Sequence, residues 1–216
     1  MIRGVYDALY GAYGDAGWWP ARTAYEVMAG AVLTQNTSWD NVVKALAGFG
    51  ENLSPEFVEN VPLADLADII RPAGFFNQKS VYLKAMTAWY KTYGYSILKA
   101  RAQAEKQPLP VLRAELLSVR GIGRETADSI LLYALDLPSF VVDAYTKRLL
   151  TRLGLIPGGG ADYESVKALF ESGIERDVYL YNNFHALIVI NAKLHCRAKP
   201  LCGGCPLAGL CPYPPC

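Results

Sequence analysis

The sequence predicts an all-α protein, and three observations support this prediction. Apolar residues recur with the 3.6-residue period of helices along most of the chain. No stretch alternates polar and apolar residues for long enough to suggest a sheet. Proline and glycine interrupt the helical segments at 71–74, 108–110 and 157–160. We therefore expect about ten helices, with no tandem repeat or low-complexity tract between them.

Each helix is predicted from its own local pattern. Thr23 and Glu26 form a capping box in Thr-Ala-Tyr-Glu, which starts a helix that runs to about Thr34. Ser38 is placed to cap the next helix, whose apolar residues fall at helical spacing. In addition to a helix at the N-terminus, we expect helices at 55–60, 62–71, 77–93, 110–119, 124 to before 138, 143–153, 162–173 and 177–194.

Length and composition limit the class of protein. A chain of 216 residues with 52% apolar and 19% charged residues is not disordered and holds one large domain or two small ones. We expect two lobes, a helical bundle at 24–136 and a second domain made of 1–23 and 137–216. No apolar run is long enough to span a bilayer, and no signal-peptide pattern is present, so we expect a cytoplasmic protein. The net charge of +1 leaves a polyanionic partner undecided.

All five cysteines lie near the end of the chain, which favours a metal site over a disulfide scaffold. Four of them have the spacing C-x5-C-x2-C-x5-C, and such a set of thiolates can enclose an iron–sulfur cubane or a tetrahedral zinc ion. The spacing alone does not choose between the two. These four ligand candidates are Cys196, Cys202, Cys205 and Cys211, and we expect Cys216 to be a free thiol.

A tight Gly-x-Gly turn joins two helical stretches around residues 116–127. Gly121 and Gly123 permit positive φ and a close approach of another chain, and the turn leads into a helix N-terminus that suits an anion. Ile122 can seat the turn, with Arg120 and Arg124 beside it. The segment therefore fits a grip on one backbone phosphate, although an ordinary helix–turn–helix corner has the same pattern.

Asp143 follows this segment in Val-Val-Asp-Ala-Tyr, at the expected start of a helix. The simplest interpretation is an N-cap, the position where aspartate is most common. The alternative is a catalytic carboxylate that stabilises a developing positive charge in a partly dry cleft and orients a water molecule. The residues alone favour the cap.

Taken in order, the Gly-Ile-Gly hairpin, the Val-Asp pair and the four-cysteine loop resemble endonuclease III and its relatives, from about Thr23 to Cys211. The resemblance implies two helical lobes with double-stranded DNA bound across the cleft. It also implies a [4Fe–4S] cluster rather than zinc on the four cysteines, and it makes Asp143 the catalytic carboxylate of a DNA glycosylase. With the resemblance, catalysis is favoured over the cap alone.

The chain departs from the family pattern at two places. In bifunctional members a lysine follows the basic residue of the hairpin and attacks the sugar as a Schiff-base nucleophile. Glu125 stands there in this sequence and has no amine, so we expect a monofunctional enzyme with little or no lyase activity. The first gap between cysteines is five residues, where the commonest family pattern has six.

Further segments look like the 3-methyladenine DNA glycosylase branch of the family. They are Trp-Trp-Pro at 18–20, Val-Leu-Thr-Gln-Asn-Thr-Ser-Trp at 32–39 and Gly-Arg-Glu-Thr-Ala-Asp at 123–128. By this resemblance, Trp39 and one of Trp18 and Trp19 sandwich the flipped base, and Gln35 fills the gap left in the duplex. An alkylated purine is cationic and stacks well on indole, whereas core packing is the alternative for each tryptophan.

The expected function is therefore hydrolysis of the N-glycosidic bond of a damaged, alkylated purine in duplex DNA, by a nucleoid-associated monomer. The alternatives are a bifunctional enzyme for oxidised pyrimidines, a mismatch enzyme of the same fold, a noncatalytic damaged-DNA-binding module and a redox-responsive DNA-binding protein. His185 and His195 are interpreted as structural, although His195 could bond a cluster sulfur. Lys79 and Lys147 could reach phosphates, but most exposed lysines are simply solvated.

Overall fold

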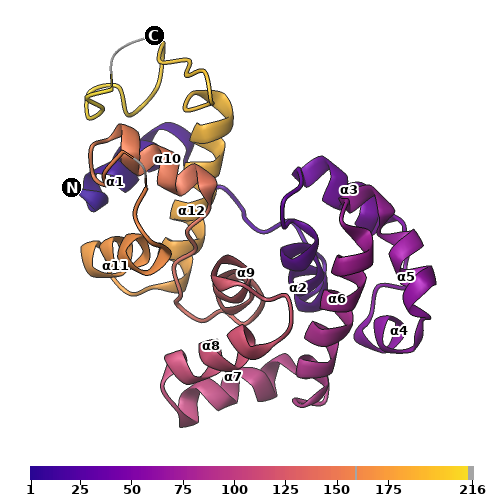
Figure 1. Cartoon of the computed structure of the whole chain (residues 1–216). Coiled ribbons are helices and arrows are strands. Elements are labelled where there is room, and N and C mark those ends of the chain that lie inside the picture. Colours follow the sequence, from indigo (N-terminus) through magenta and orange to yellow (C-terminus); the bar gives the residue numbers. More distant parts are fainter. Residues whose placement is uncertain (159, 214–216) are drawn as a thin grey trace. The chain divides into compact units, whose positions relative to one another are not determined.

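The computed structural model describes residues 1–158 and 160–213, and in these residues every regular element is a helix. The all-α prediction is confirmed (Figure 1). Cys216, the expected free thiol, lies outside the described residues. In the described part of the chain, every helix is too short or too polar to cross a bilayer.

The elements follow one another as α-helices with one short 3₁₀ helix and one π-helix. In chain order they are α1 (Ile2–Tyr13), α2 (Ala24–Leu33), α3 (Trp39–Ala47), α4 (Pro55–Asn60), α5 (Leu63–Ile69), the 3₁₀ helix η1 (Arg71–Ala73), α6 (Phe76–Lys91), α7 (Ile97–Lys106), α8 (Leu109–Ser118), α9 (Arg124–Ser129), the π-helix η2 (Ile130–Ala134), α10 (Ala144–Arg152), α11 (Tyr163–Gly173) and α12 (Val178–Leu194).

The chain forms two compact units. The first, here called the terminal unit, consists of Met1–Pro20 and Pro138–Cys216. The second, the internal unit, is the continuous segment Ala21–Leu137. Each unit has its own buried core.

The internal unit is built around α2, which is buried from Tyr25 to Leu33 except for Glu26. A helix that is apolar on all sides belongs in the middle of a bundle. Accordingly, α2 packs against α3, α6, α9 and the π-helix.

The caps of α2 and α3 differ from the prediction in detail. Thr23 Oγ1 accepts from Glu26 N at 3.1 Å, as expected, but the Glu26 carboxylate accepts from Arg22 N rather than closing the box on Thr23. Ser38 is the N-cap residue of α3, yet its side chain makes no capping hydrogen bond.

Two helical stretches were not predicted correctly. α7 was missed because only Ala100 of its ten residues is buried, which leaves no apolar period to detect. The helix expected from 124 to Pro138 is α-helical only to Ser129 and continues as a π-helix over Ile130–Ala134. All five residues of that π-helix are buried, so the change from α-helix to π-helix lies within the packed core. A local sequence pattern does not reveal it.

The terminal unit is built around α12, which packs against α1 and α10 (Figure 1). Its core is an aromatic cluster in which Phe140 stacks on Phe170 with ring centroids 3.9 Å apart. Tyr181 and Phe184 of α12 meet Phe140 edge-on. The cluster anchors the extended segment that carries the chain into α10.

Candidate functional site

Asp143 is the N-cap of α10, which confirms the capping role that its sequence position predicted. Its Oδ1 accepts from Thr146 N at 2.7 Å and from Thr146 Oγ1 at 2.9 Å. Both capping bonds end on the same oxygen, and Oδ2 takes part in neither. The side chain is 13% exposed, which is low for a capping aspartate.

His185 of α12 faces the other carboxylate oxygen. Its Nε2 lies 3.6 Å from Asp143 Oδ2, and the imidazole is 6% exposed. Burial raises the pKa of Asp143, but His185 and the hydrogen bonds from Thr146 outweigh burial and hold that pKa below its ordinary value. The terminal unit thus contains a nearly buried carboxylate that is ionised at neutral pH.

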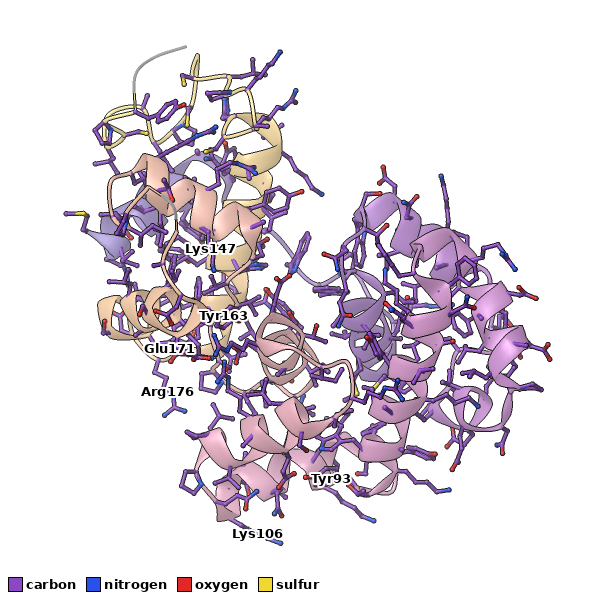
Figure 2. All side chains as sticks on the ribbon, viewed as in Figure 1. Tyr93, Lys106, Lys147, Tyr163, Glu171 and Arg176 are labelled. Atoms are coloured by element: carbon purple, nitrogen blue, oxygen red, sulfur yellow. The ribbon has the colours of Figure 1, made fainter. Side chains whose placement is uncertain are left out.

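The segment before Asp143 is fixed by α11. Phe140 N donates to Glu171 Oε1 at 2.9 Å, and Val142 N donates to the Tyr163 hydroxyl at 3.3 Å. Figure 2 labels both of these α11 residues. Because the extended backbone is held on one side and α10 begins on the other, the aspartate has little freedom to move.

The hairpin between α8 and α9 lies in the internal unit. Gly121 has φ +85°, and a Cβ at this position would lie 2.1 Å from the Tyr82 ring of α6. Only glycine permits both this conformation and this contact. Ile122 is 5% exposed and seats the turn as expected, whereas Arg120 and Arg124 are exposed. The turn therefore presents backbone and two cations to solvent.

Gln35 is attached to this hairpin. Its Nε2 donates to Gly121 O and to Thr126 Oγ1, each at 2.9 Å. An ion pair also braces the hairpin, in which Arg113 donates to both oxygens of the buried Asp128 carboxylate. The internal unit therefore brings Gln35 and the predicted phosphate-binding turn together.

The predicted base-stacking tryptophans are divided between the units. Trp18 and Trp19 belong to the terminal unit, where their rings meet edge-on with centroids 5.8 Å apart. Trp39 is the first residue of α3 in the internal unit. All three side chains are half-buried, so none is a fully buried core residue. Glu125, in the first turn of α9, is exposed.

The four candidate ligand cysteines form no disulfide and lie in the loop that follows α12. Burial raises the pKa of Cys205, and the neighbouring Cys196 and Cys202 raise it further. Within residues 1–158 and 160–213, no three His, Cys, Asp or Glu side chains converge as metal ligands. The donor set nevertheless fits a metal centre, because four thiols without disulfides share one segment and a guanidinium contacts one of them.

Two arginines of α10 hold this cysteine loop. Arg152 Nη1 donates to Cys196 Sγ at 3.2 Å, and Arg148 Nε donates to Cys196 O at 2.7 Å. Cys211 Sγ donates to Arg152 O at 3.5 Å. His195 Nδ1 lies 3.0 Å from Leu201 O, so its recorded bond is to the loop backbone. One helix therefore carries Asp143 at its start and grips the cysteine loop at its end.

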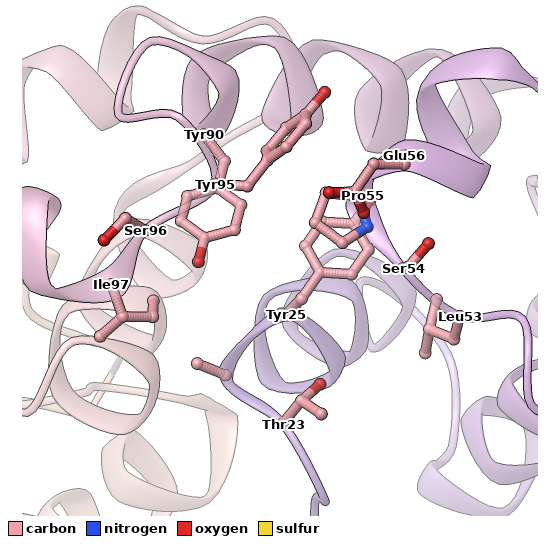
Figure 3. Close-up of a pocket in the computed structure, with 11 residues that line it drawn as sticks. Thr23, Tyr25, Leu53, Ser54, Pro55, Glu56, Tyr90, Tyr95, Ser96 and Ile97 are labelled. Carbon is pink, nitrogen blue, oxygen red and sulfur yellow. The ribbon is translucent and has the colours of Figure 1, made fainter.

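A cavity of about 540 Å³ opens elsewhere in the internal unit, beside the first turn of α2 (Figure 3). Tyr25, Tyr90 and Tyr95 gather around it with Glu56. None of the residues that the sequence identified as a candidate site lines this cavity.

Sequence reasoning missed several contacts of the site. His185 was interpreted as structural, and neither Tyr82 nor Arg152 was singled out. Their only local signal is a polar or aromatic residue in a helix, which is common. Lys79 was a candidate for phosphate contacts, but it is 2% exposed and its Nζ donates to Leu33 O and Ala73 O inside the internal unit. It is therefore a buried cap of α2 and not a surface cation.

The all-helical fold, the glycine hairpin between α8 and α9 and the aspartate that caps α10 match the class of helix-hairpin-helix DNA glycosylases. The model of the HhH-GPD superfamily of base excision DNA repair proteins matches residues 29–176, and the chain belongs to this superfamily. It is a DNA base-excision repair glycosylase, and the resemblance to endonuclease III is confirmed.

Individual relatives agree with this assignment. One relative is a Methanocaldococcus jannaschii protein whose name describes it as a DNA repair glycosylase. It is 49% identical over 203 residues, which are 93% of this chain and 91% of that protein. The crystal structure of the H. pylori 3-methyladenine DNA glycosylase MagIII, bound to 1,N6-ethenoadenine, is 29% identical, with a TM-score of 0.73 and coverage of 89% and 95%. A trapped endonuclease III–DNA covalent intermediate is 24% identical and shares the fold, with a TM-score of 0.78 and coverage of 98% and 94%.

Proposed function

We propose that this glycosylase is monofunctional and hydrolyses the N-glycosidic bond of alkylated, 3-methyladenine-type purines in double-stranded DNA. The observation that carries the proposal is Asp143, a nearly buried carboxylate that His185 and Thr146 keep ionised. A negative charge in a poorly solvated site stabilises a nearby developing cation far more than it would in water.

Asp143 has two tasks in the proposed reaction. As the bond between C1′ and the base nitrogen breaks, the base takes the bonding electrons and the sugar becomes an oxocarbenium-like cation, whose charge the carboxylate stabilises. Oδ2 orients a water molecule, whose oxygen bonds to C1′ while its proton passes to the carboxylate. The products are a free base and an abasic site.

The absence of a lyase step is proposed from Glu125. A carboxylate cannot form the imine with the sugar that β-elimination requires, so water is the nucleophile instead. By the family resemblance, bifunctional members have a lysine at this hairpin position, and this chain lacks that amine.

The preference for alkylated purines is proposed from the tryptophans. Trp39 and one of Trp18 and Trp19 would hold the extruded base, because a cationic purine gains a cation–π contribution on indole faces. Gln35 would fill the gap left in the duplex. The H. pylori relative is itself named a 3-methyladenine DNA glycosylase, which supports this branch.

The hairpin at residues 120–124 would bind one DNA phosphate. Its backbone N–H groups and the exposed Arg120 and Arg124 suit an anion, and phosphate contacts position a protein on duplex DNA without reading sequence.

We expect the enzyme to act as a monomer.

A [4Fe–4S] cluster is the cofactor that the four cysteines would hold. When bound, it would supply structural order and orient the loop toward DNA, and it would take no part in hydrolysis. Arg152 would then donate a hydrogen bond to the Cys196 ligand. Iron and acid-labile sulfide per chain, measured with zinc in purified protein, distinguish the cluster from a zinc centre.

The test is incubation with alkylated duplex DNA and chromatography of the released bases. We expect free 3-methyladenine, and no covalent adduct when borohydride is added. Release of oxidised pyrimidines together with a trapped adduct would show the bifunctional activity instead. A protein that binds the lesion duplex and releases no base from any damaged substrate would contradict the proposal.

A further inference from the structure

We propose that His185 is the positioning residue for Asp143, holding Oδ2 of the catalytic carboxylate in one orientation toward the reacting sugar. The inference rests on the proposed role of Asp143. The reason for an imidazole at this place lies in how the two carboxylate oxygens are used.

The cap contacts only one oxygen of the carboxylate. Both hydrogen bonds from Thr146 end on Oδ1, so the cap restrains the torsion about Cβ–Cγ, which moves both oxygens together, from one side only. That sp³–sp² torsion of aspartate is broad, with no sharp rotamer wells. His185 Nε2, 3.6 Å from Oδ2, supplies the second point of attachment.

The imidazole is itself held in place. It is 6% exposed on α12, which packs along α10, and its neighbours Tyr181 and Phe184 on the same helix are fully buried. Side chains in such a close-packed core occupy single rotamers. His185 is therefore a fixed support against which the carboxylate can be oriented.

An ordinary capping aspartate in the same unit has no such support. Asp177 caps α12 through Oδ1, which accepts from Leu180 N at 2.7 Å, and this aspartate is exposed. A cap thus needs only one oxygen and no burial. Burying the Asp143 carboxylate disfavours its charge, a cost that a capping role does not explain and that a charge-stabilising role does.

The test compares His185→Leu, which removes the ring nitrogen, with His185→Gln, which keeps an N–H donor, in the full-length protein. The substrate is the lesion duplex that wild-type protein cleaves fastest. We expect single-turnover excision by His185→Leu to fall on the order of tenfold or more, as for coupled residues in contact, with affinity for abasic-site duplex nearly unchanged. The acid limb of its pH–rate profile should move to higher pH, because the chief group that lowers the Asp143 pKa is gone. His185→Gln should recover part of the rate.

Further variants separate the possible failures. Asp143→Asn should abolish excision while DNA binding remains. The double variant of Asp143→Asn and His185→Leu should be no slower than Asp143→Asn alone. Asp177→Asn is the matched capping control. If Asp143→Asn still excises, the proposed function fails and the role of His185 falls with it. If Asp143→Asn is inactive but His185→Leu keeps the wild-type rate and acid limb, only the positioning role is overturned. The positioning role would also be overturned if both His185 variants lost rate in proportion to a lower melting temperature and weaker DNA binding.

Discussion

Asp143 is a helix cap and, in the proposed function, also a reactant. Its two oxygens have different neighbours, Thr146 on Oδ1 and His185 facing Oδ2, so capping does not consume the whole group. Lys79 is a second charged side chain that caps a helix. Its ammonium group is buried in the core, where it donates to Leu33 O at the end of α2 and to Ala73 O. A charged side chain used in this way affects how stability depends on pH.

Burial lowers the pKa of Lys79 to about 8. In the unfolded chain this lysine keeps its ordinary pKa near 10.5, so the folded state binds the proton less tightly. The cost of burying the charge is therefore present in full below pH 8 and fades as the pH rises toward 10.5. Relative to a Lys79→Met variant, wild-type protein should gain about 2 kcal/mol of unfolding free energy between pH 7.5 and 9.5.

Urea unfolding of both proteins at the two pH values measures this difference, and the subtraction cancels the other groups that titrate. A difference that stays constant with pH would show that the Lys79 pKa is not lowered in the folded protein.

At the scale of elements, the hairpin depends on one glycine more than on the other. Gly121 combines a positive φ with a Tyr82 ring where its Cβ would be, whereas Gly123 has φ −89° and open space around it. Gly121→Ala should therefore destabilise the protein by about 1–3 kcal/mol and weaken binding to duplex DNA. Gly123→Ala should leave the unfolding free energy nearly unchanged.

Denaturant unfolding and fluorescence anisotropy with a DNA duplex measure the two effects. Equal destabilisation by both alanines would show that the conformation of Gly121 does not matter to the turn.

In the proposed function, residue 125 in the first turn of α9 decides whether water or an amine is the nucleophile. Introducing an amine by Glu125→Lys should produce a covalent adduct with a lesion duplex in borohydride, because a lysine near C1′ can form a Schiff base. Glu125→Gln, which removes the charge without adding an amine, should form none. Denaturing gel electrophoresis of the trapped complex is the measurement, and an adduct with wild-type protein would contradict the monofunctional proposal.

At the scale of the whole molecule, α10 links the proposed chemistry to the cysteine loop within the terminal unit. Asp143 stands at its start, and Arg148 in its middle and Arg152 at its end donate hydrogen bonds to Cys196. The proposed cluster should therefore stabilise this unit by ordering the loop against α10.

Cys202→Ser should lower the iron and sulfide content per chain and reduce the melting temperature, because a cluster that binds only the folded chain stabilises it. Cys216→Ser is the matched control and should change neither, since that cysteine is predicted to be the spare. Metal analysis with thermal unfolding provides the test. Unchanged iron content in Cys202→Ser would remove Cys202 from the ligand set.

The helical class, most helix positions and the family could all be read from the sequence. Periodicity, caps and glycine turns act over a few residues. The sequence therefore predicts the Thr23 cap, the Gly-Ile-Gly turn and the spaced cysteines from local patterns. Where the local signal is weak, as in α7 with one buried residue, the prediction failed. The π-helix after Ser129 was likewise invisible to a 3.6-residue period.

The partners of the site residues were decided only by the tertiary structure. His185 faces Asp143, Tyr82 lies against Gly121, and Arg152 contacts Cys196, and each pair joins residues far apart in the chain. Such contacts arise when separate helices pack, and no short-range pattern encodes which buried side chains will meet. The motifs show where the chemistry is carried, whereas packing determines how each reactive group is oriented and charged.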